Sequence, residues 1–131
     1  MTRKIGLTLP QRGTFFDVLS LSELVETGHW ADETGLFESL WIGDSLLAKP
    51  RPESIALFGS LAAVTRNVRL AVGCMASFPV RDPILFADQW ATLDQLSAGR
   101  MLLAVCTGIV KPTDASAREG APYGVSDASR A

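Results

Sequence analysis

Short apolar runs alternate along the chain with longer segments in which apolar residues recur every three or four positions. The short runs cover residues 5–9, 39–42, 68–72 and 101–105, and turn-forming residues flank each of them. Runs of this length and character predict β-strands. They begin roughly 30 residues apart, the length of a strand–helix–strand unit. The pattern therefore predicts parallel strands connected by helices.

Three helices are predicted between these strands, because both ends of the helical segments carry capping signals. Ser20 and Glu23 form a capping-box pattern, and Gly35 stands where a glycine would end the first helix. The other two helices have comparable signals, namely Pro52–Glu53 at the start of the second, and Asp82–Pro83 and Gly99 at the two ends of the third. The apolar stripes of these helices predict faces that pack on a sheet.

A parallel sheet covered by helices is compatible with two α/β architectures, an open doubly wound sheet and part of a (βα)8 barrel. The doubly wound sheet predicts a glycine-rich phosphate loop after the first strand, but residues 9–13 read Leu-Pro-Gln-Arg-Gly. The missing loop weakens the doubly wound sheet and leaves part of a (βα)8 barrel as the other architecture. Residues 107–131 are rich in Ala, Ser, Gly, Asp and Pro, and we expect a loop and flexible tail there.

Composition and charge exclude several classes of protein. Apolar residues make up 47% of the chain and charged residues 20%, which is a globular composition. The 12 Lys and Arg against 14 Asp and Glu leave no cationic excess for nucleic acid. No apolar run approaches the ~20 residues that cross a bilayer, and no signal-peptide core is present, so we expect a cytoplasmic protein without a membrane partner.

Few residues are available for metal or disulfide chemistry. Cys74 and Cys106 are the two cysteines and His29 is the one histidine, so neither a disulfide framework nor a metal site is expected. The cysteines are expected to be small buried hydrophobic residues. His29 is expected to face solvent from a helix.

The active site of a βα barrel lies at the carboxyl ends of its strands, so the residues that follow each apolar run are the candidates for chemistry. These segments are residues 10–13, 43–45, 73–76 and 106–108. They suit a small-molecule substrate, but no histidine accompanies Asp44 and Ser45, so a hydrolase triad is not predicted. Asp44 has an equally plausible interpretation as a helix-capping or loop carboxylate.

Several segments resemble the N-terminal half of the luciferase-like monooxygenase family. They are residues 4–10, 38–47, 51–53, 81–83 and above all 91–100, whose sequence Ala-Thr-Leu-Asp-Gln-Leu-Ser-Ala-Gly-Arg is similar to a signature of the family. The resemblance covers roughly residues 3–110. It implies a TIM-barrel oxidoreductase that uses reduced FMN with oxygen, or a deazaflavin coenzyme for hydride transfer.

The resemblance also implies a set of site residues. Asp44 and Ser45 would be the catalytic candidates, as polar contacts to the substrate or the ring. The segment Cys74, Met75 and Ala76 would bind the cofactor, with a cis peptide between Cys74 and Met75 as a bulge under the ring and Met75 in the cavity. Thr107 and Gly108 would supply backbone donors to the cofactor.

Some positions depart from the family pattern. Many members have a histidine where Ser45 and Asp82 stand, and luciferases proper have an arginine in place of Thr107. These differences argue against a luciferase itself, and they remove the obvious general acid or base.

The barrel of the family has eight strands, and four are predicted here. The resemblance therefore implies a parallel (βα)4 half of a TIM barrel, formed by residues 1–106. We expect an N-terminal fragment, or a half-barrel completed by a second copy or by a complementing half. Weak FMN binding is expected, because barrels commonly hold the phosphate in loops after late strands. Leu7, Trp41 and Leu103 are expected on an inner face left open. The alternative is a catalytically inert half-barrel that acts as an assembly or binding module.

Overall fold

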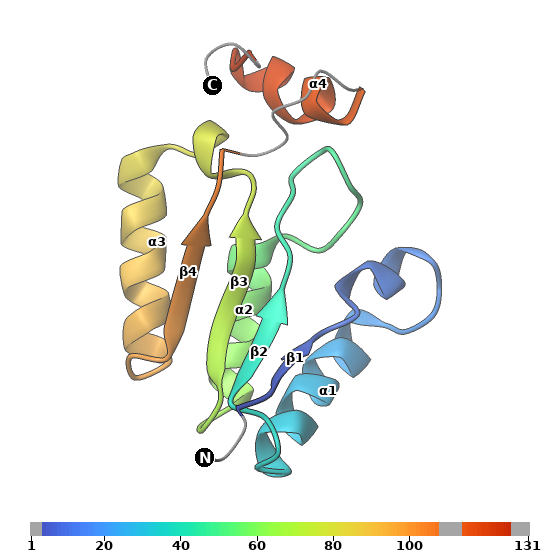
Figure 1. Cartoon of the computed structure of the whole chain (residues 1–131), viewed down its shortest axis with the longest axis vertical. Coiled ribbons are helices and arrows are strands. Elements are labelled where there is room, and N and C mark those ends of the chain that lie inside the picture. The colour runs from blue at the N-terminus through green and yellow to red at the C-terminus, as the bar shows by residue number, and fades with distance from the viewer. Residues whose placement is uncertain (1–3, 108–113, 127–131) are drawn as a thin grey trace.

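The computed structural model describes residues 4–107 and 114–126 and contains a four-stranded parallel sheet with helices between its strands (Figure 1). The strands are β1 (Gly6–Thr8), β2 (Ser39–Ile42), β3 (Arg69–Met75) and β4 (Met101–Val105). The helices are α1 (Leu21–Glu33), α2 (Ser54–Val64), α3 (Pro83–Leu96) and α4 (Asp114–Gly120), with short 3-10 turns at Gln11–Phe15, Phe78–Val80 and Ala121–Tyr123. None of the helices within these ranges is long and apolar enough to span a membrane.

The helix ends form where the capping signals predict them. Ser20 is the N-cap of α1: its Oγ accepts from the backbone N–H of Glu23 at 3.1 Å, and the Glu23 carboxylate accepts from the N–H of Ser20 at 2.6 Å. Gly35 follows α1 with a φ of 63°, which is the left-handed conformation of a helix terminator. Asp82 caps α3 by accepting from the N–H of Leu85 at 2.8 Å. Local sequence therefore fixes these boundaries.

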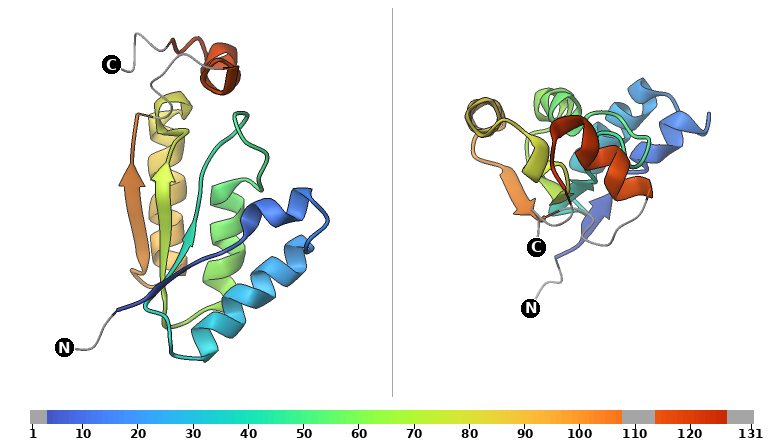
Figure 2. Two further views of the ribbon diagram at one scale, coloured as in Figure 1. Left: turned by 45° about the vertical axis from the view of Figure 1, so that its right-hand side comes forward. Right: turned by 90° about the horizontal axis from the view of Figure 1, so that it is seen from above.

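The order of strands and the side on which the helices lie distinguish the two architectures. The sheet order is β1-β2-β3-β4, so each strand pairs with the next one along the chain. Helices α1, α2 and α3 all cover the same face of the sheet (Figure 2). A doubly wound sheet reverses its strand order and carries helices on both faces. The arrangement is therefore that of consecutive βα units in a barrel wall, as predicted.

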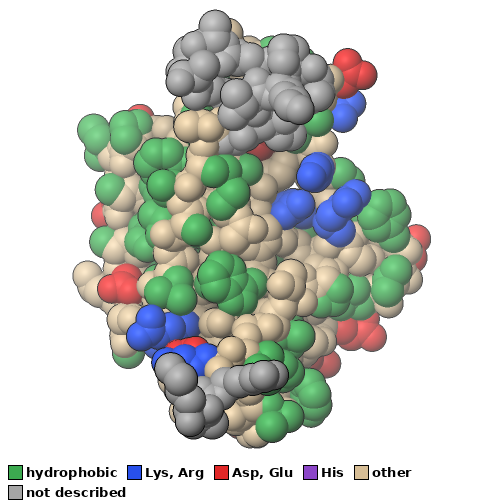
Figure 3. All heavy atoms as spheres, viewed as in Figure 1, with side chains coloured by type: hydrophobic (Ala, Val, Ile, Leu, Met, Phe, Trp, Pro, Cys, Tyr) green, Lys and Arg blue, Asp and Glu red, His purple; other side chains and the backbone are tan. Residues whose placement is uncertain are grey.

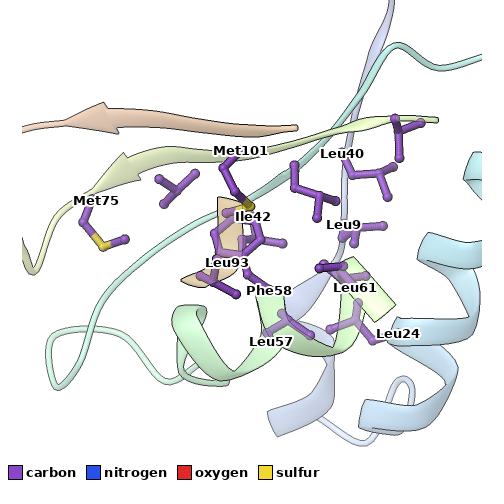
Figure 4. Close-up of a cluster of buried hydrophobic side chains, with 14 of the residues drawn as sticks. Leu9, Leu24, Leu40, Ile42, Leu57, Phe58, Leu61, Met75, Leu93 and Met101 are labelled. Carbon is purple, nitrogen blue, oxygen red and sulfur yellow. The ribbon is translucent and has the colours of Figure 1, made fainter. Parts of the chain in front are cut away.

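The hydrophobic core lies between the sheet and these helices (Figure 4). Leu40 and Ile42 of β2 point into it, and they meet Phe58 and Leu61 of α2, all at most 1% exposed. Because side chains alternate across a strand, Trp41 between them points to the opposite, inner face. That face carries no helix among the described residues, and Trp41 remains partly exposed.

Leu7 and Leu103 do not share the inner face with Trp41, so that expectation is wrong for both. Leu7 packs against the core on the helix side of β1. Leu103 pairs in register with Val72, a core residue, and lines an outer groove beside α3. The alternation of each strand determines these directions, and hydrophobicity alone does not reveal them.

A bulge interrupts β3 near its carboxyl end, and it corrects the expected geometry of this segment. Gly73 pairs with Ala104 and Met75 with Val105, so β3 has one residue more than β4 between these pairs. The non-proline cis peptide joins Gly73 and Cys74, one bond before the predicted position. Because of the extra residue, the side chain of Met75 points to the helix side of the sheet, where it is 0% exposed in the core. The expectation that Met75 lies in the cavity is therefore wrong.

Part of the segment expected to be an irregular tail forms α4. This helix lies beyond the carboxyl ends of the strands (Figures 1 and 2). Its Glu119 is 4% exposed, which shows that the helix is docked rather than free. The composition of residues 107–131 did not reveal this, because Glu119 binds a loop that is distant in the chain.

Candidate functional site

A pocket of about 480 Å³ opens on the inner face of the sheet at the carboxyl ends of β1, β2 and β3. Residues from the ends of these strands and from the two following loops line it. The principal ones are Thr8, Gln11, Arg12, Trp41, Arg51 and Gly73. The space-filling view of this face shows a group of Lys or Arg side chains next to the sheet (Figure 3). This is the rim at which sequence reasoning expected the active site.

Trp41 and Gly73 form the floor of the pocket. The indole Nε1 of Trp41 donates to the Oγ of Ser39 at 2.8 Å, which fixes the ring against the sheet. A Cβ atom at Gly73 would lie 2.8 Å from Cε3 of Trp41, so only glycine allows the ring to lie there. The result is a flat, largely apolar surface beside polar loops, as in many small-molecule sites.

Gln11 holds the two loops of the rim together. Its side chain is 3% exposed, and its Oε1 accepts from the backbone N–H of Gly43 at 2.8 Å. Its Nε2 donates to the carbonyl of Pro52 at 3.2 Å. The loop after β1 is thereby tied to both ends of the loop after β2, and the rim is preorganised.

Two arginines bring positive charge to the pocket. Arg51 lies over Gly43, where any Cβ would overlap its Nη1. Burial, together with the charge of Arg12, lowers the pKa of Arg51, although Asp44 and Glu119 act in the opposite direction. Arg12 is exposed, with its guanidinium 5.7 Å from the ring centroid of Phe16. The charged form of Arg51 is thus disfavoured by its surroundings.

Asp44 lies directly after β2, but its oxygens are already engaged. The carboxylate is 5% exposed and accepts from Ser54 Oγ at 2.7 Å and from the N–H of Ser77 at 2.6 Å. Arg81 forms an ion pair with it at 3.1 Å and bridges to Glu53 at 2.8 Å. Asp44 therefore ties the end of β2 to the start of α2 and to the loop after β3.

Glu119 of α4 binds the loop that follows Asp44. Its carboxylate accepts from the backbone N–H groups of Leu46, Leu47 and Ala48 at 2.8, 2.7 and 2.6 Å. It also accepts from the hydroxyl of Ser45 at 3.3 Å. Carboxylates that accept several backbone N–H bonds form strong attachments. Ser45 thus belongs to this attachment.

The two cysteines meet across β3 and the end of β4. Cys74 Sγ lies 2.7 Å from Cys106 Sγ, and both are partly exposed free thiols rather than fully buried hydrophobic residues. The hydrogen bond to Cys106 and burial, helped by the nearby charge of Asp44, raise the pKa of Cys74. A raised thiol pKa lowers the fraction of nucleophilic thiolate. The described residues contain no group of three or more His, Cys, Asp or Glu side chains placed to hold a metal ion.

The remaining predicted residues are spread over the rim. Ala76 lines a cavity of about 70 Å³ together with Asp44, Ser45 and Glu119. Thr107 is exposed. Gly108 lies outside the described residues. The structure thus brings Asp44, Ser45 and Ala76 together, and it places them beside the larger pocket rather than in its lining.

Sequence reasoning missed two residues of this region. Arg51 was noted only as part of a resemblance, although a charge in the loop after a barrel strand is a signal for the rim. Glu119 had no comparable signal, because its partners lie more than 70 positions earlier in the chain. Gln11 and Arg12 were included in the first rim segment without a stated role.

Comparison with known proteins agrees with this fold. Residues 4–126 match the family model of luciferase-like monooxygenases. The chain is 37% identical over 98 residues to 4-hydroxyprotoasukamycin monooxygenase of Streptomyces nodosus subsp. asukaensis, covering 73% of this chain and 26% of that protein.

Two structures of greater length contain the same fold. The oxygenating constituent of 3,6-diketocamphane monooxygenase from Pseudomonas putida, in complex with FMN, is 22% identical with a TM-score of 0.73, over 92% of this chain and 33% of that one. The coenzyme F420-dependent tetrahydromethanopterin reductase of Methanopyrus kandleri is 22% identical with a TM-score of 0.64, over 83% and 28%. The chain thus spans about a quarter to a third of the length of these proteins. The fold and the matched residues together show that the chain belongs to the luciferase-like monooxygenase family.

Proposed function

We propose that this chain supplies four βα units of an oxidoreductase barrel that acts on a small molecule with a reduced flavin or deazaflavin coenzyme. One observation carries the proposal: the inner-face pocket at the carboxyl ends of β1 to β3, with a flat floor and a polar rim. Its volume of about 480 Å³ lies in the ordinary range for ligand sites. The names of the similar structures, one in complex with FMN and one F420-dependent, support this class of coenzyme.

The residues present fit a planar ring. Gly73 has no side chain to obstruct the floor, and the indole of Trp41 is held in place by Ser39. Gln11 fixes the spacing of the rim loops, so the floor needs little reorganisation on binding. In such a site the bound coenzyme supplies the redox chemistry, while the protein binds, orients and excludes water.

The contacts to substrate or coenzyme that stay predictions are those of Asp44, Ser45, Cys74, Ala76, Thr107 and Gly108. Asp44 and Ser45 adjoin the pocket but already bind Ser54, Ser77, Arg81 and Glu119. We infer that their first role is to hold the rim in shape. A direct contact would require an exchange of partners.

A flavin titration tests the proposal. We expect these 131 residues to quench FMN fluorescence only weakly, with a dissociation constant above about 100 μM. The described sheet has four strands, and barrels commonly hold the phosphate in loops after the seventh and eighth. Gly73→Ala should abolish this residual binding, because its Cβ would collide with Trp41. Gly59→Ala in α2, where a Cβ meets nothing within 4 Å, is the matched control and should bind like the parent.

Two results would contradict the proposal. One is the absence of any saturable FMN or F420 binding to a folded chain at millimolar coenzyme. The other is equal binding by the Gly73→Ala variant. A stoichiometric yellow protein after dialysis would instead show that the phosphate is held within this chain.

A second candidate is an inert assembly module, which is favoured by an apolar groove of about 1010 Å³ between α3 and β4. Phe86, Trp90 and Leu103 line it. A surface of this kind marks an interaction site. Association without any flavin binding would favour this candidate.

A further inference from the structure

We propose that the inner-face pocket binds an oxyanion between Arg12 and Arg51, and that this oxyanion is a carboxylate of the substrate. The assignment to a substrate rests on the proposed function. The binding of an anion rests on the pocket alone. The site lies on the rim loops after β1 and β2.

Arg51 is the central residue because its guanidinium lacks hydrogen-bond partners among the described residues. Its Nε is buried without a hydrogen-bond partner. Within the described ranges, its guanidinium makes no hydrogen bond and no ion pair within 4 Å. A guanidinium offers five donors in a fixed fork, and leaving them unused in a half-buried position is unfavourable. An anion in the pocket would satisfy them.

The nearest carboxylates are committed elsewhere. Asp44 is engaged by Ser54, Ser77 and Arg81. Glu119 is engaged by the amides that dock α4. Their charges favour the protonated guanidinium, yet burial and Arg12 outweigh them and lower the pKa of Arg51. Within the described ranges, neither carboxylate forms an ion pair with this guanidinium, although both lie near enough to act on its pKa.

Arg12 adds a second cation from the opposite loop. Two like charges lining one pocket repel each other, and an oxyanion between them turns the repulsion into two charge-assisted contacts. Gln11 holds the two loops at a fixed spacing through Gly43 and Pro52, so the pair cannot separate freely. The geometry is therefore preorganised for an anion.

A carboxylate on a planar group matches the floor of the pocket. Without coenzyme, Trp41 offers a ring face beside the arginines to the flat apolar body of an anionic ligand. With the coenzyme ring on this floor, the arginines at the rim would hold the substrate carboxylate beside that ring. A coenzyme phosphate is the other source of an oxyanion. Barrel enzymes commonly hold that phosphate after their seventh and eighth strands, which leaves the rim of β1 and β2 to the substrate.

Ligand titrations of the full chain by NMR test this, with the indole N–H of Trp41 as the reporter. The probes are benzoate, its neutral analogue benzamide, and inorganic phosphate. We expect benzoate to shift the Trp41 signal saturably, and benzamide to bind about tenfold more weakly or worse, as the loss of a charge-assisted hydrogen bond predicts. Phosphate should bind more weakly than benzoate, because it gains nothing from the ring.

Variants assign the binding to the two arginines. Arg51→Gln and Arg12→Gln should each remove the preference for benzoate over benzamide. Arg69→Gln makes the same change of charge at the exposed amino end of β3, and it should keep the preference. Arg12 is exposed, so its variant still decides the question if Arg51→Gln fails to fold.

Equal binding of benzoate and benzamide, or no binding of either to the folded chain, would overturn the proposal. Phosphate that binds more tightly than benzoate and displaces it would overturn the assignment to a substrate and identify a phosphate site. No flavin is present in these titrations. Failure here with normal flavin binding would reject the anion site alone, whereas success here without flavin binding would reject the proposed function.

Discussion

Asp32 at the end of α1 organises the connection between α2 and β3 through its carboxylate. The oxygens accept from the backbone N–H groups of Val68, Asn67 and Arg66 at 2.7, 2.8 and 2.8 Å. Burial by itself raises the pKa of Asp32, but these three hydrogen bonds and the charge of Arg100 outweigh it, so the pKa lies below 3.8. The ionised form is therefore the one that the fold stabilises.

We expect Asp32→Asn to lower the free energy of unfolding by about 2–3 kcal/mol at neutral pH, because an amide nitrogen would face backbone donors. A folded-state pKa below the unfolded one gives stability that is present above pH 3.8 and is lost as the pH falls through the folded-state pKa. The difference between parent and variant should therefore shrink in acid.

Urea unfolding followed by circular dichroism between pH 2 and 7 measures this difference. Asp88→Asn, at an exposed position of α3, is the control and should follow the parent throughout. A gap between parent and Asp32→Asn that stays constant down to pH 2 would contradict the expected role of the carboxylate.

At the scale of elements, Glu119 attaches α4 to the loop after β2. Glu119 gathers three backbone N–H groups of the loop after β2, and it does so from a short helix of seven residues. Glu119→Gln should weaken these bonds, because a neutral amide oxygen is a poorer acceptor than a carboxylate. We expect the amides of Leu46, Leu47 and Ala48 to exchange with solvent about ten- to a hundredfold faster.

Hydrogen exchange measured by NMR gives the rates for these three amides directly. Arg118→Gln changes the adjacent exposed residue of α4 and should leave the rates unchanged. Amides in the core strand β3 should keep their protection in both variants. Unchanged exchange at residues 46–48 in Glu119→Gln would show that α4 is held by other contacts.

The elements also show how far sequence reasoning extends. The strand positions and the starts of α1, α2 and α3 follow from local patterns, so Ser20, Glu53 and Asp82 were sufficient to place the helices. The bulge at residues 73–75 depends on how β3 aligns with β4. Residue type does not encode this alignment locally, so the cis bond was placed one position too late.

The candidate site was predicted only in outline for the same reason. The rule that barrel sites follow the carboxyl ends of strands pointed to the rim at which the inner-face pocket lies. The rule did not distinguish the roles of Asp44 and Arg51. Asp44 has hydrogen-bond partners in α2 and in the loop after β3, whereas the buried Nε of Arg51 has none among the described residues. That distinction requires tertiary contacts between segments distant in the chain.

At the scale of the whole molecule, the sheet has two open edges. Its order, β1-β2-β3-β4, leaves β1 and β4 with a neighbour on one side only within the described residues. Unpaired strand edges are templates for pairing with another chain. The groove beside β4 adds apolar surface at this edge, and Leu103 in its lining is 39% exposed. Val105, at the end of β4, is 53% exposed. Both features favour pairing with another chain, which stays a prediction.

We expect the purified chain to associate at low micromolar concentration rather than remain at its monomer mass of 14.0 kDa. Two copies related by a twofold axis could pair β1 of each with β4 of the other, which would bury both edges. Val105→Lys should oppose this association, because a lysine on an edge strand disfavours pairing. Val18→Lys introduces the same charge at a valine that is 73% exposed and outside the sheet, so it should associate like the parent.

Light scattering coupled to size exclusion measures the mass of each variant. The expected result is a parent and a Val18→Lys variant above monomer mass, with Val105→Lys shifted toward the monomer. The physical reason is that burying the apolar side chain of Val105 contributes about 1.5–3 kcal/mol, and a lysine in its place loses this contribution. In a dimer with twofold symmetry the loss occurs at both interfaces. A parent that stays monomeric and unfolds cooperatively would contradict this prediction. It would show that four βα units with open edges form a stable fold without pairing to another chain.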